Sequence, residues 1–497
     1  PAPNCLPGTR VEIVRRISSW IETEGSQSIC WLNGLAGSGK SAIAQHVAEI
    51  YAEKNQLAAS FFFSRREVQR RTTQHFFPTL SSQLLNSFPS IKQSIAAALD
   101  EDYTVLREQM QKLVLGPLCA MTEHPASPVL IVVDSLDECD NEHPVVELIN
   151  LLVQLIRQSP HPCRLLITSR IESHIQDTFR EPSIVPMTLS LQLATFDAEE
   201  DIRSFMVHAF DKIYKMRHLI ADGVQRPWPP TDELEKLLDK ASGLFIFATT
   251  VTKFVDSKHQ DPRARLQVIL NDTHSSSGGT PFADLDTLYQ DAIRTIDDAD
   301  LVQLVLGVVR HVSNPLSIRA LNRILSPLCN IIAAHIFPDL GSVLLVPEDP
   351  EDEEQPVRIY HTSFSDFLSN PDRAGDYFVD PNVYHPLLAR LCLEHMCGTL
   401  KKDMCDIGDP SKLNSEVDDL SQRCNERIDE VIRYVCLQWS YHLTRIPTTA
   451  AMDETLMKFL VEFSRKSILH WVETLSLLGA MDSVITMLRD AISWFKV

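Results

Sequence analysis

The sequence feature that most constrains the fold is a glycine-rich run near the N-terminus. Gly-Leu-Ala-Gly-Ser-Gly-Lys-Ser occupies positions 34–41, after the apolar residues 29–32 and before a helical pattern over 42–51. Glycines let such a loop wrap a phosphate chain, while backbone N–H groups and the helix N-terminus face the anion. Strand, tight loop and helix in this order predict a nucleotide site. The predicted phosphate-binding residues are Gly34, Leu35, Ala36, Gly37, Ser38, Gly39, Lys40, Ser41 and Ala42.

Length and charge narrow the class of protein. The 497 residues favour two to four domains, and 44% apolar with 23% charged residues is typical of a globular protein. A formal net charge of −20 argues against general binding to nucleic acid, because phosphate neutralisation requires clustered Lys and Arg. The densest basic cluster is Arg65, Arg66, Arg70 and Arg71. No apolar run reaches the ~18 residues that a membrane span requires.

The 11 cysteines are scattered, which fits a reducing compartment, and we expect a cytoplasmic location. Cys392, His395, Cys397 and Cys405 lie close together and raise the question of zinc. Leucines interleave them in a helical pattern, which favours buried thiols on one helix face. Because the first residue is proline, we expect the chain to be part of a longer protein.

Residues 5–193 alternate short apolar runs with helical stretches, a pattern that predicts a parallel sheet covered by helices. Continuous apolar runs are typical of strands buried on both faces. The predicted strands are residues 28–32, 58–63, 129–133, 164–168 and 184–191, and the predicted helices between them are 76–88, 91–99 and 145–157. The fold class is therefore α/β, with five parallel strands.

The remainder of the chain reads as mainly helical. Two apolar segments, 341–346 and 357–360, flank an acidic decapeptide and follow helices at 285–296 and 301–311, which indicates a winged helix with a solvated acidic tip. Docking of a partner on that tip is the alternative. The expected segments are an NTPase domain at 1–195, a helical domain at 196–272, a linker at 273–284, a winged helix at 285–385 and a helical segment at 386–497.

Acidic residues follow the third predicted strand, at the sheet edge where α/β proteins bind ligands. Asp134 is placed to bind Mg²⁺ together with the hydroxyl of Ser41. Asp137 and Glu138 are the catalytic candidates, and Glu138 is favoured for polarising the attacking water. An acidic loop after a core strand is the simpler alternative.

The fourth predicted strand ends in Thr168-Ser169-Arg170. An arginine at that edge can reach a γ-phosphate and sense its presence, so Arg170 is the predicted sensor.

These motifs, in this order and at these separations, resemble the NACHT class of signal-transducing NTPases, the STAND proteins, which have an ASCE-type P-loop core. The pair Asp137-Glu138 after Asp134 is similar to the NACHT pattern. Cys-Leu-Pro-Gly-Thr-Arg at 5–10 and Gly-Leu-Phe-Ile-Phe-Ala-Thr at 243–249 further resemble fungal NACHT proteins, which are NLR-like and have a nephrocystin-like N-terminal region. In those proteins the core commonly lies between an effector domain and C-terminal repeats.

The segment His-Thr-Ser-Phe-Ser-Asp-Phe-Leu at 361–368 resembles part of the family's winged helix. The resemblance implies that His361 contacts the β-phosphate of bound ADP and holds a closed state. From the residues alone, His361 is a polar residue at a strand-to-helix junction, with Ser363 capping the next helix. Many animal relatives have Gly-Leu-Pro where this chain has Gly243-Leu244-Phe245, so the choice between ATP and GTP stays open.

The resemblance implies a switch that binds ADP and ATP, or GTP, with Mg²⁺ and hydrolyses the triphosphate slowly. Nucleotide exchange would open the domains and permit self-oligomerisation, with an effector or ligand acting through regions outside this chain. A role in signalling akin to fungal innate immunity or heterokaryon incompatibility follows from the same resemblance. The alternatives are an efficient AAA-type remodelling NTPase and a scaffold with a vestigial site.

Overall fold

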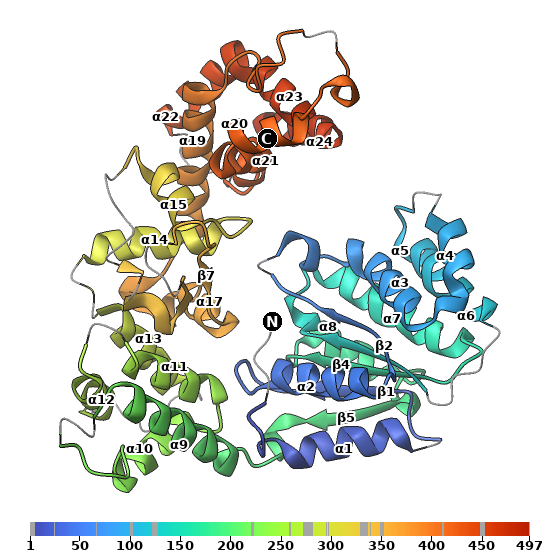
Figure 1. The fold of residues 1–497 in the computed structure, drawn as a ribbon, viewed down its shortest axis with the longest axis vertical. Helices are drawn as coiled ribbons and strands as arrows, with labels where there is room; N and C mark the ends of the chain where they lie inside the picture. The colour runs from blue at the N-terminus through green and yellow to red at the C-terminus, as the bar shows by residue number, and fades with distance from the viewer. Residues whose placement is uncertain are drawn as a thin grey trace. The chain divides into compact units, whose positions relative to one another are not determined.

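The computed structural model describes residues 5–496 apart from 24, 66, 100–102, 122–127, 220–222, 258–259, 272–281, 295, 297, 329–335, 338, 348–351, 410–411 and 448–452. The chain divides into two units (Figure 1). The first comprises residues 1–256 and 261–285, and the second comprises 257–260 and 286–497.

A five-stranded parallel sheet forms the centre of the first unit, which confirms the predicted fold class. Its strand order is β2-β3-β4-β1-β5. The strands are β1 (Ile29–Asn33), β2 (Leu57–Phe62), β3 (Val129–Asp134), β4 (Cys163–Ser169) and β5 (Thr188–Gln192). β4 therefore lies between β1, which leads into the phosphate loop, and β3, which ends in the acidic residues. Because all five strands are parallel, their carboxyl ends share one edge of the sheet.

Four strands lie within one residue of the predicted bounds, but the prediction for β5 was wrong at its start. β5 begins at Thr188, four residues later than predicted, and Val185–Met187 form a 3₁₀ turn. Pro186 has no N–H group to donate to the sheet, so the chain joins β1 only after this turn.

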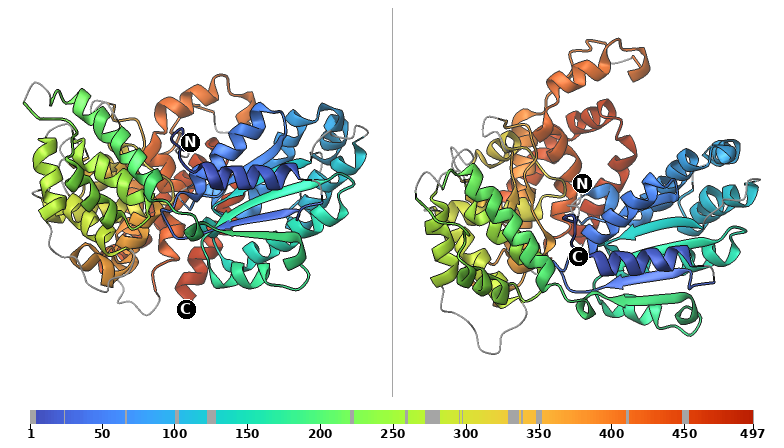
Figure 2. Two further views of the ribbon diagram at one scale, coloured as in Figure 1. Left: turned by 90° about the horizontal axis from the view of Figure 1, so that it is seen from below. Right: turned by 60° about the horizontal axis from the view of Figure 1, so that its bottom comes forward.

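Helices cover both faces of the sheet (Figure 2). α1 (Val11–Glu22) and α2 (Lys40–Glu53) bury apolar side chains against the face that carries Cys30 and Leu32 of β1. α3 (Phe76–Ser87) and α7 (Glu142–Gln158) pack on the opposite face, with Ile29 and Trp31. Alternate side chains of one strand thus enter two cores, and each fully buried large side chain contributes roughly 1.5–3 kcal/mol.

The helices between the strands match the prediction with small differences. α2 and α7 each extend beyond both predicted ends, while α3 ends at Ser87. The predicted helix at 91–99 begins as a 3₁₀ turn, Pro89–Ile91, which leads into α4 (Lys92–Leu99).

Helices follow β5 in the described part of the first unit. They are α9 (Glu199–Met216), α10 (Thr231–Ala241), α11 (Phe245–Val255) and α12 (Pro262–Asn271). Most of the predicted linker, residues 272–281, lies outside the described residues. α13 (Ala283–Arg294) begins within the range predicted as linker.

The second unit contains a small β-hairpin among helices. α14 (Ala299–His311) and α15 (Ile318–Leu325) precede β6 (Leu344–Leu345), which pairs antiparallel with β7 (Arg358–Ile359). Both strands are shorter than predicted, because residues 339–342 form a 3₁₀ turn and the pairing covers two residues of each strand. In the acidic decapeptide, Glu353 and Glu354 form ion pairs with Arg319 of α15.

Helices account for most of the described residues after 386. They include α19 (Pro381–Thr399), α20 (Leu420–Arg427), α21 (Glu430–Leu443), α22 (Glu454–Glu462), α23 (Ile468–Leu477) and α24 (Met481–Lys496). Cys392 is fully buried on α19, and burial raises the pKa of its thiol. No group of three or more His, Cys, Asp or Glu residues is placed to hold a metal ion in the part of the chain that the structure describes. None of the described helices has both the length and the apolar character that crossing a membrane requires.

Candidate nucleotide-binding site

The phosphate loop has the backbone that its glycines allow. Gly37 and Gly39 have φ values of 73° and 98°, a region that other L-residues rarely adopt. α2 begins at Lys40, directly after this turn. The loop therefore ends at a helix N-terminus, where unpaired N–H groups and the helix dipole favour an anion.

Lys40 folds back onto the loop and is 8% exposed. Its Nζ donates hydrogen bonds to the carbonyl oxygens of Gly34 and Leu35, each at 2.9 Å. An ammonium group has three N–H donors, so these bonds use two of them. Burial lowers the pKa of Lys40, whereas the negative charges of Asp137 and Asp134 raise it. The acidic residues thus favour a charged ammonium inside the loop.

A chain of hydroxyl groups joins the phosphate loop to the acidic end of β3. Thr168 Oγ1 donates to Asp134 Oδ1 at 2.5 Å, and Ser135 Oγ donates to Asp134 Oδ2 at 2.9 Å. Ser41 Oγ lies 3.1 Å from Ser135 Oγ. Asp134 is 3% exposed, and burial raises the pKa of its carboxyl group while these hydroxyl groups lower it.

This set of groups fits Mg²⁺. The ion prefers oxygen ligands, usually one or two carboxylates together with hydroxyl, water and phosphate oxygens. Ser41 and Asp134 offer a hydroxyl and a carboxylate linked through one serine. The structure thus brings together the two residues predicted to hold the metal.

Asp137 is paired with Arg170, the predicted sensor. The Arg170 backbone N–H donates to Asp137 Oδ1 at 2.9 Å, and Arg170 Nε lies 3.1 Å from Asp137 Oδ2. Asp137 is buried, so this ion pair is shielded from water and its geometry is well defined. These two contacts hold Arg170 against Asp137.

Glu138 contacts the loop that follows β2. The Arg65 backbone N–H donates to Glu138 Oε2 at 3.3 Å, and Arg65 Nη2 donates to the Asp137 carbonyl oxygen at 2.6 Å. In the sequence, Arg65 stands out only as part of a basic cluster. The structure instead places it beside Glu138, the carboxylate predicted to polarise the attacking water.

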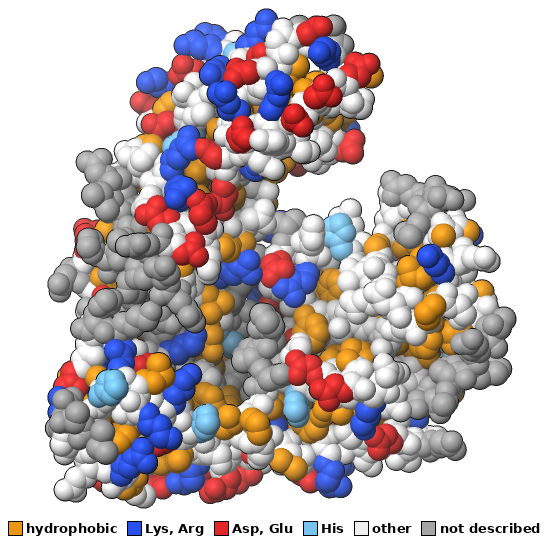
Figure 3. All heavy atoms as spheres, in the orientation of Figure 1, with side chains coloured by type: hydrophobic (Ala, Val, Ile, Leu, Met, Phe, Trp, Pro, Cys, Tyr) orange, Lys and Arg blue, Asp and Glu red, His pale blue; other side chains and the backbone are white. Residues whose placement is uncertain are grey.

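The described arginines of that cluster are paired with acids. Arg65 lies 3.7 Å from Glu172, and Arg71 lies 3.5 Å from Asp140. Arg70 pairs with Glu67. On the face drawn in Figure 3, basic and acidic side chains are interspersed.

His361 lies in the second unit, at the N-terminus of α17 (Thr362–Leu368). The Ser363 N–H donates to His361 Nδ1 at 3.1 Å, so the prediction that Ser363 caps the helix was wrong and the histidine is the cap. Ser363 Oγ lies 2.7 Å from both His361 Nδ1 and Tyr289 OH. Because Nδ1 accepts, the neutral ring carries its proton on Nε2.

Sequence reasoning missed two residues of the Asp134 network. Thr168 accepts from the Ser135 N–H at 2.9 Å and donates to Asp134. Ser135 has a φ of 55°, a left-handed conformation that turns the chain sharply after β3. The signal for Thr168 was its place at the end of a strand beside β3, directly before the Ser169-Arg170 pair.

Fold and site together define a P-loop nucleotide-binding protein. Residues 9–170, about a third of the chain, match the model of the family described as Nephrocystin 3, N-terminal. The matched range includes the phosphate loop, Asp134 and Arg170, and ends before His361. No curated protein is similar enough to the chain to match.

Solved structures offer distant similarities. The chain is 13% identical to the Aeropyrum pernix Orc1 protein in complex with DNA, with a TM-score of 0.34 and coverage of 73% of this chain and 92% of that chain. It is 12% identical to a chain of Drosophila ORC bound to DNA, with a TM-score of 0.34 and coverage of 70% and 91%. At these scores the similarity supports no conclusion about partners.

Proposed function

We propose that the chain is a nucleotide-dependent signalling switch of the NACHT/STAND class, of the fungal type. It binds ADP and ATP with Mg²⁺ and hydrolyses ATP slowly. The observation that carries this proposal is the network that joins the phosphate loop, through Ser41 and Ser135, to Asp134. The match of residues 9–170 to a nephrocystin-type model supports the same class.

Each residue has a distinct task in this proposal. The loop N–H groups and Lys40 hold the phosphates, while Ser41 and Asp134 would hold Mg²⁺. The ion, when bound, neutralises charge that develops on the phosphate oxygens. Glu138 orients the attacking water, and Arg170, held by Asp137, contacts the γ-phosphate.

Slow hydrolysis follows from how these groups are held. The Glu138 carboxylate accepts a hydrogen bond from the Arg65 backbone, and Arg170 is paired with Asp137. This hydrogen bond engages one oxygen of the Glu138 carboxylate with the protein instead of with the attacking water. Both groups therefore have to rearrange before the chemistry proceeds.

The proposal assigns His361 the contact with the β-phosphate of ADP through its Nε2–H donor. Exchange for ATP changes that contact and shifts the equilibrium toward an open form that self-associates. An effector and an activating ligand act through regions outside this chain, and signalling takes place in the cytoplasm. We propose no nucleic-acid partner, because the described arginines of the densest basic cluster are paired with acids.

The test is the nucleotide that the purified chain carries. We expect the purified chain to release ADP when it is denatured, as identified by mass spectrometry. We expect the Lys40→Ala variant to release no nucleotide. GDP in place of ADP would assign the switch to guanine nucleotides. Fast, substrate-stimulated hydrolysis by a constitutive ring would contradict the switch and favour the remodelling NTPase.

A further inference from the structure

Two consecutive carbonyl groups of the phosphate loop accept hydrogen bonds from outside the loop. The Ser38 carbonyl oxygen accepts from Arg10 Nη2 at 2.7 Å, and the Gly37 carbonyl oxygen accepts from the Ile246 N–H at 3.1 Å. Arg10 directly precedes α1, whereas Ile246 lies in the first turn of α11. The peptide plane is rigid, so a fixed Ser38 carbonyl also fixes the direction of the Gly39 N–H.

The segment before α1 is shaped to present Arg10. Gly8 has a φ of 88°, and the Thr9 hydroxyl donates to the Leu6 carbonyl oxygen at 2.7 Å, which closes a tight turn. Arg10 itself has a φ of 58°, a left-handed conformation that is unfavourable for a residue other than glycine. Strain of this kind persists only where the surroundings hold it, and here they hold it against the phosphate loop.

The side chain of Arg10 is enclosed by the helical part of the same unit. It is 4% exposed, its guanidinium lies 4.7 Å from the centre of the Phe245 ring, and its Nε lies 3.9 Å from Asp201. Burial lowers the pKa of Arg10, whereas the Asp201 charge raises it. Among the described residues, Nε and Nη1 find no hydrogen-bond partner. A buried cation with incomplete pairing is costly, so its placement calls for a role beyond stability.

We propose that Arg10 is a positioning residue that couples the phosphate loop to α9 and α11. It orients the Gly39 N–H toward the phosphates and at the same time packs against Phe245 and Asp201. Coupling of this kind is reciprocal, so a nucleotide in the loop stabilises the first turn of α11, and α11 strengthens nucleotide binding. The inference rests on the proposed nucleotide site and adds to it the route by which occupancy reaches the helical segment.

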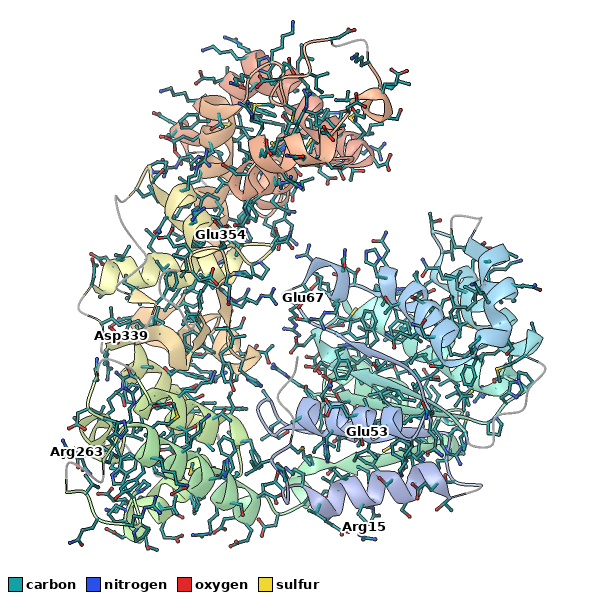
Figure 4. The ribbon with its side chains drawn as sticks, in the orientation of Figure 1. Arg15, Glu53, Glu67, Arg263, Asp339 and Glu354 are labelled. Carbon is teal, nitrogen blue, oxygen red and sulfur yellow. The ribbon has the colours of Figure 1, made fainter. Side chains whose placement is uncertain are left out.

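The test compares Arg10→Ala and Arg10→Lys with Arg15→Ala. Arg15 lies on the surface of α1 with its side chain 67% exposed and paired with Glu12, so it is a matched control (Figure 4). We expect Arg10→Ala to lower the affinity for Mg²⁺-ADP about tenfold or more, since a buried hydrogen bond from a charged donor is lost. Arg10→Lys recovers part of the affinity, because one ammonium N–H can reach the Ser38 carbonyl. Arg15→Ala binds as the unchanged chain does.

Hydrogen exchange distinguishes coupling by Arg10 from a purely structural role of this residue. In the unchanged chain ADP slows exchange of the Ile246 amide, and in Arg10→Ala this effect of ADP is lost. Wild-type affinity together with intact ADP-dependent protection in Arg10→Ala overturns the inference. If Arg10→Ala does not fold, the Phe245→Leu variant tests the inference instead. Weaker ADP binding by Phe245→Leu supports the coupling, and unchanged ADP binding overturns it. A wild-type chain that binds no nucleotide contradicts the proposed function itself.

Discussion

At the scale of single residues, Thr168 is the side chain on which the proposed metal site most depends. It donates to Asp134 and accepts from the Ser135 N–H, and both partners are buried. An oxygen atom with these two contacts fixes the rotamer of the carboxylate and the turn after β3. The proposed Mg²⁺ site therefore depends on a residue that is not one of its predicted ligands.

We predict that Thr168→Val weakens Mg²⁺-dependent nucleotide binding. The substitution keeps the shape but leaves the Ser135 N–H and one Asp134 oxygen without this partner, at a cost of about 1–3 kcal/mol in stability. Titration of ADP with Mg²⁺ and with EDTA measures the effect, and the loss should appear only with Mg²⁺. Thr168→Ser, which keeps the hydroxyl, is the control. Equal losses in both titrations would contradict the positioning role.

At the scale of elements, apolar patterning predicted the sheet well because β1, β3 and β4 are buried along their whole length and each contains at least three consecutive apolar residues. Apolar patterning failed where backbone hydrogen bonding determines where a strand begins, as at Pro186 before β5. The site residues could be predicted where a residue type suited to the chemistry stands at a recognisable place in a motif, as Lys40 and Asp134 do. The contacts between the phosphate loop, Arg10 and α11 could not, because Ile246 bonds to Gly37, and Phe245 packs on Arg10, across more than 200 residues of sequence.

The cap of α17 allows a prediction about His361. His361→Ala removes both the capping acceptor and the proposed phosphate donor, so it mixes two effects. His361→Asp keeps a good cap, and loss of a cap typically costs about 1 kcal/mol. With nucleotide removed from both proteins, we expect His361→Asp to unfold at the temperature of the unchanged chain. We expect it to lose ADP, because its charge repels phosphate. Thermal unfolding and retention of ADP through gel filtration measure the two effects, and ADP retained by His361→Asp would contradict the phosphate contact.

At the scale of the whole molecule, the second unit carries an acid-sensitive core between α14, α19 and α21. His385 Nδ1 lies 3.1 Å from His442 Nδ1, and the ring of His311 lies 5.1 Å from that of His385. Burial lowers the pKa of His311 to about 4 and of His385 to about 3, and it lowers the pKa of His442 in the same direction. The neighbouring Arg310 and Arg445 lower the pKa of His385 further.

The sign of the pH dependence follows from these shifts. Between the folded pKa values and the ordinary value of 6.5, the unfolded chain binds more protons, so the second unit loses stability as the pH falls through this range. Between pH 7 and pH 5 the loss is about 2 kcal/mol for each buried histidine. The loss of stability is measured by urea unfolding at pH 7 and at pH 5, with hydrogen exchange of the α21 amides as the probe of the second unit. His311→Gln should reduce the pH dependence by one proton, whereas replacement of the exposed His208 in the first unit should leave it unchanged. A second unit that is equally stable at pH 5 and pH 7 would show that these histidines bind as many protons in the folded chain as in the unfolded chain, so that folding does not lower their pKa values.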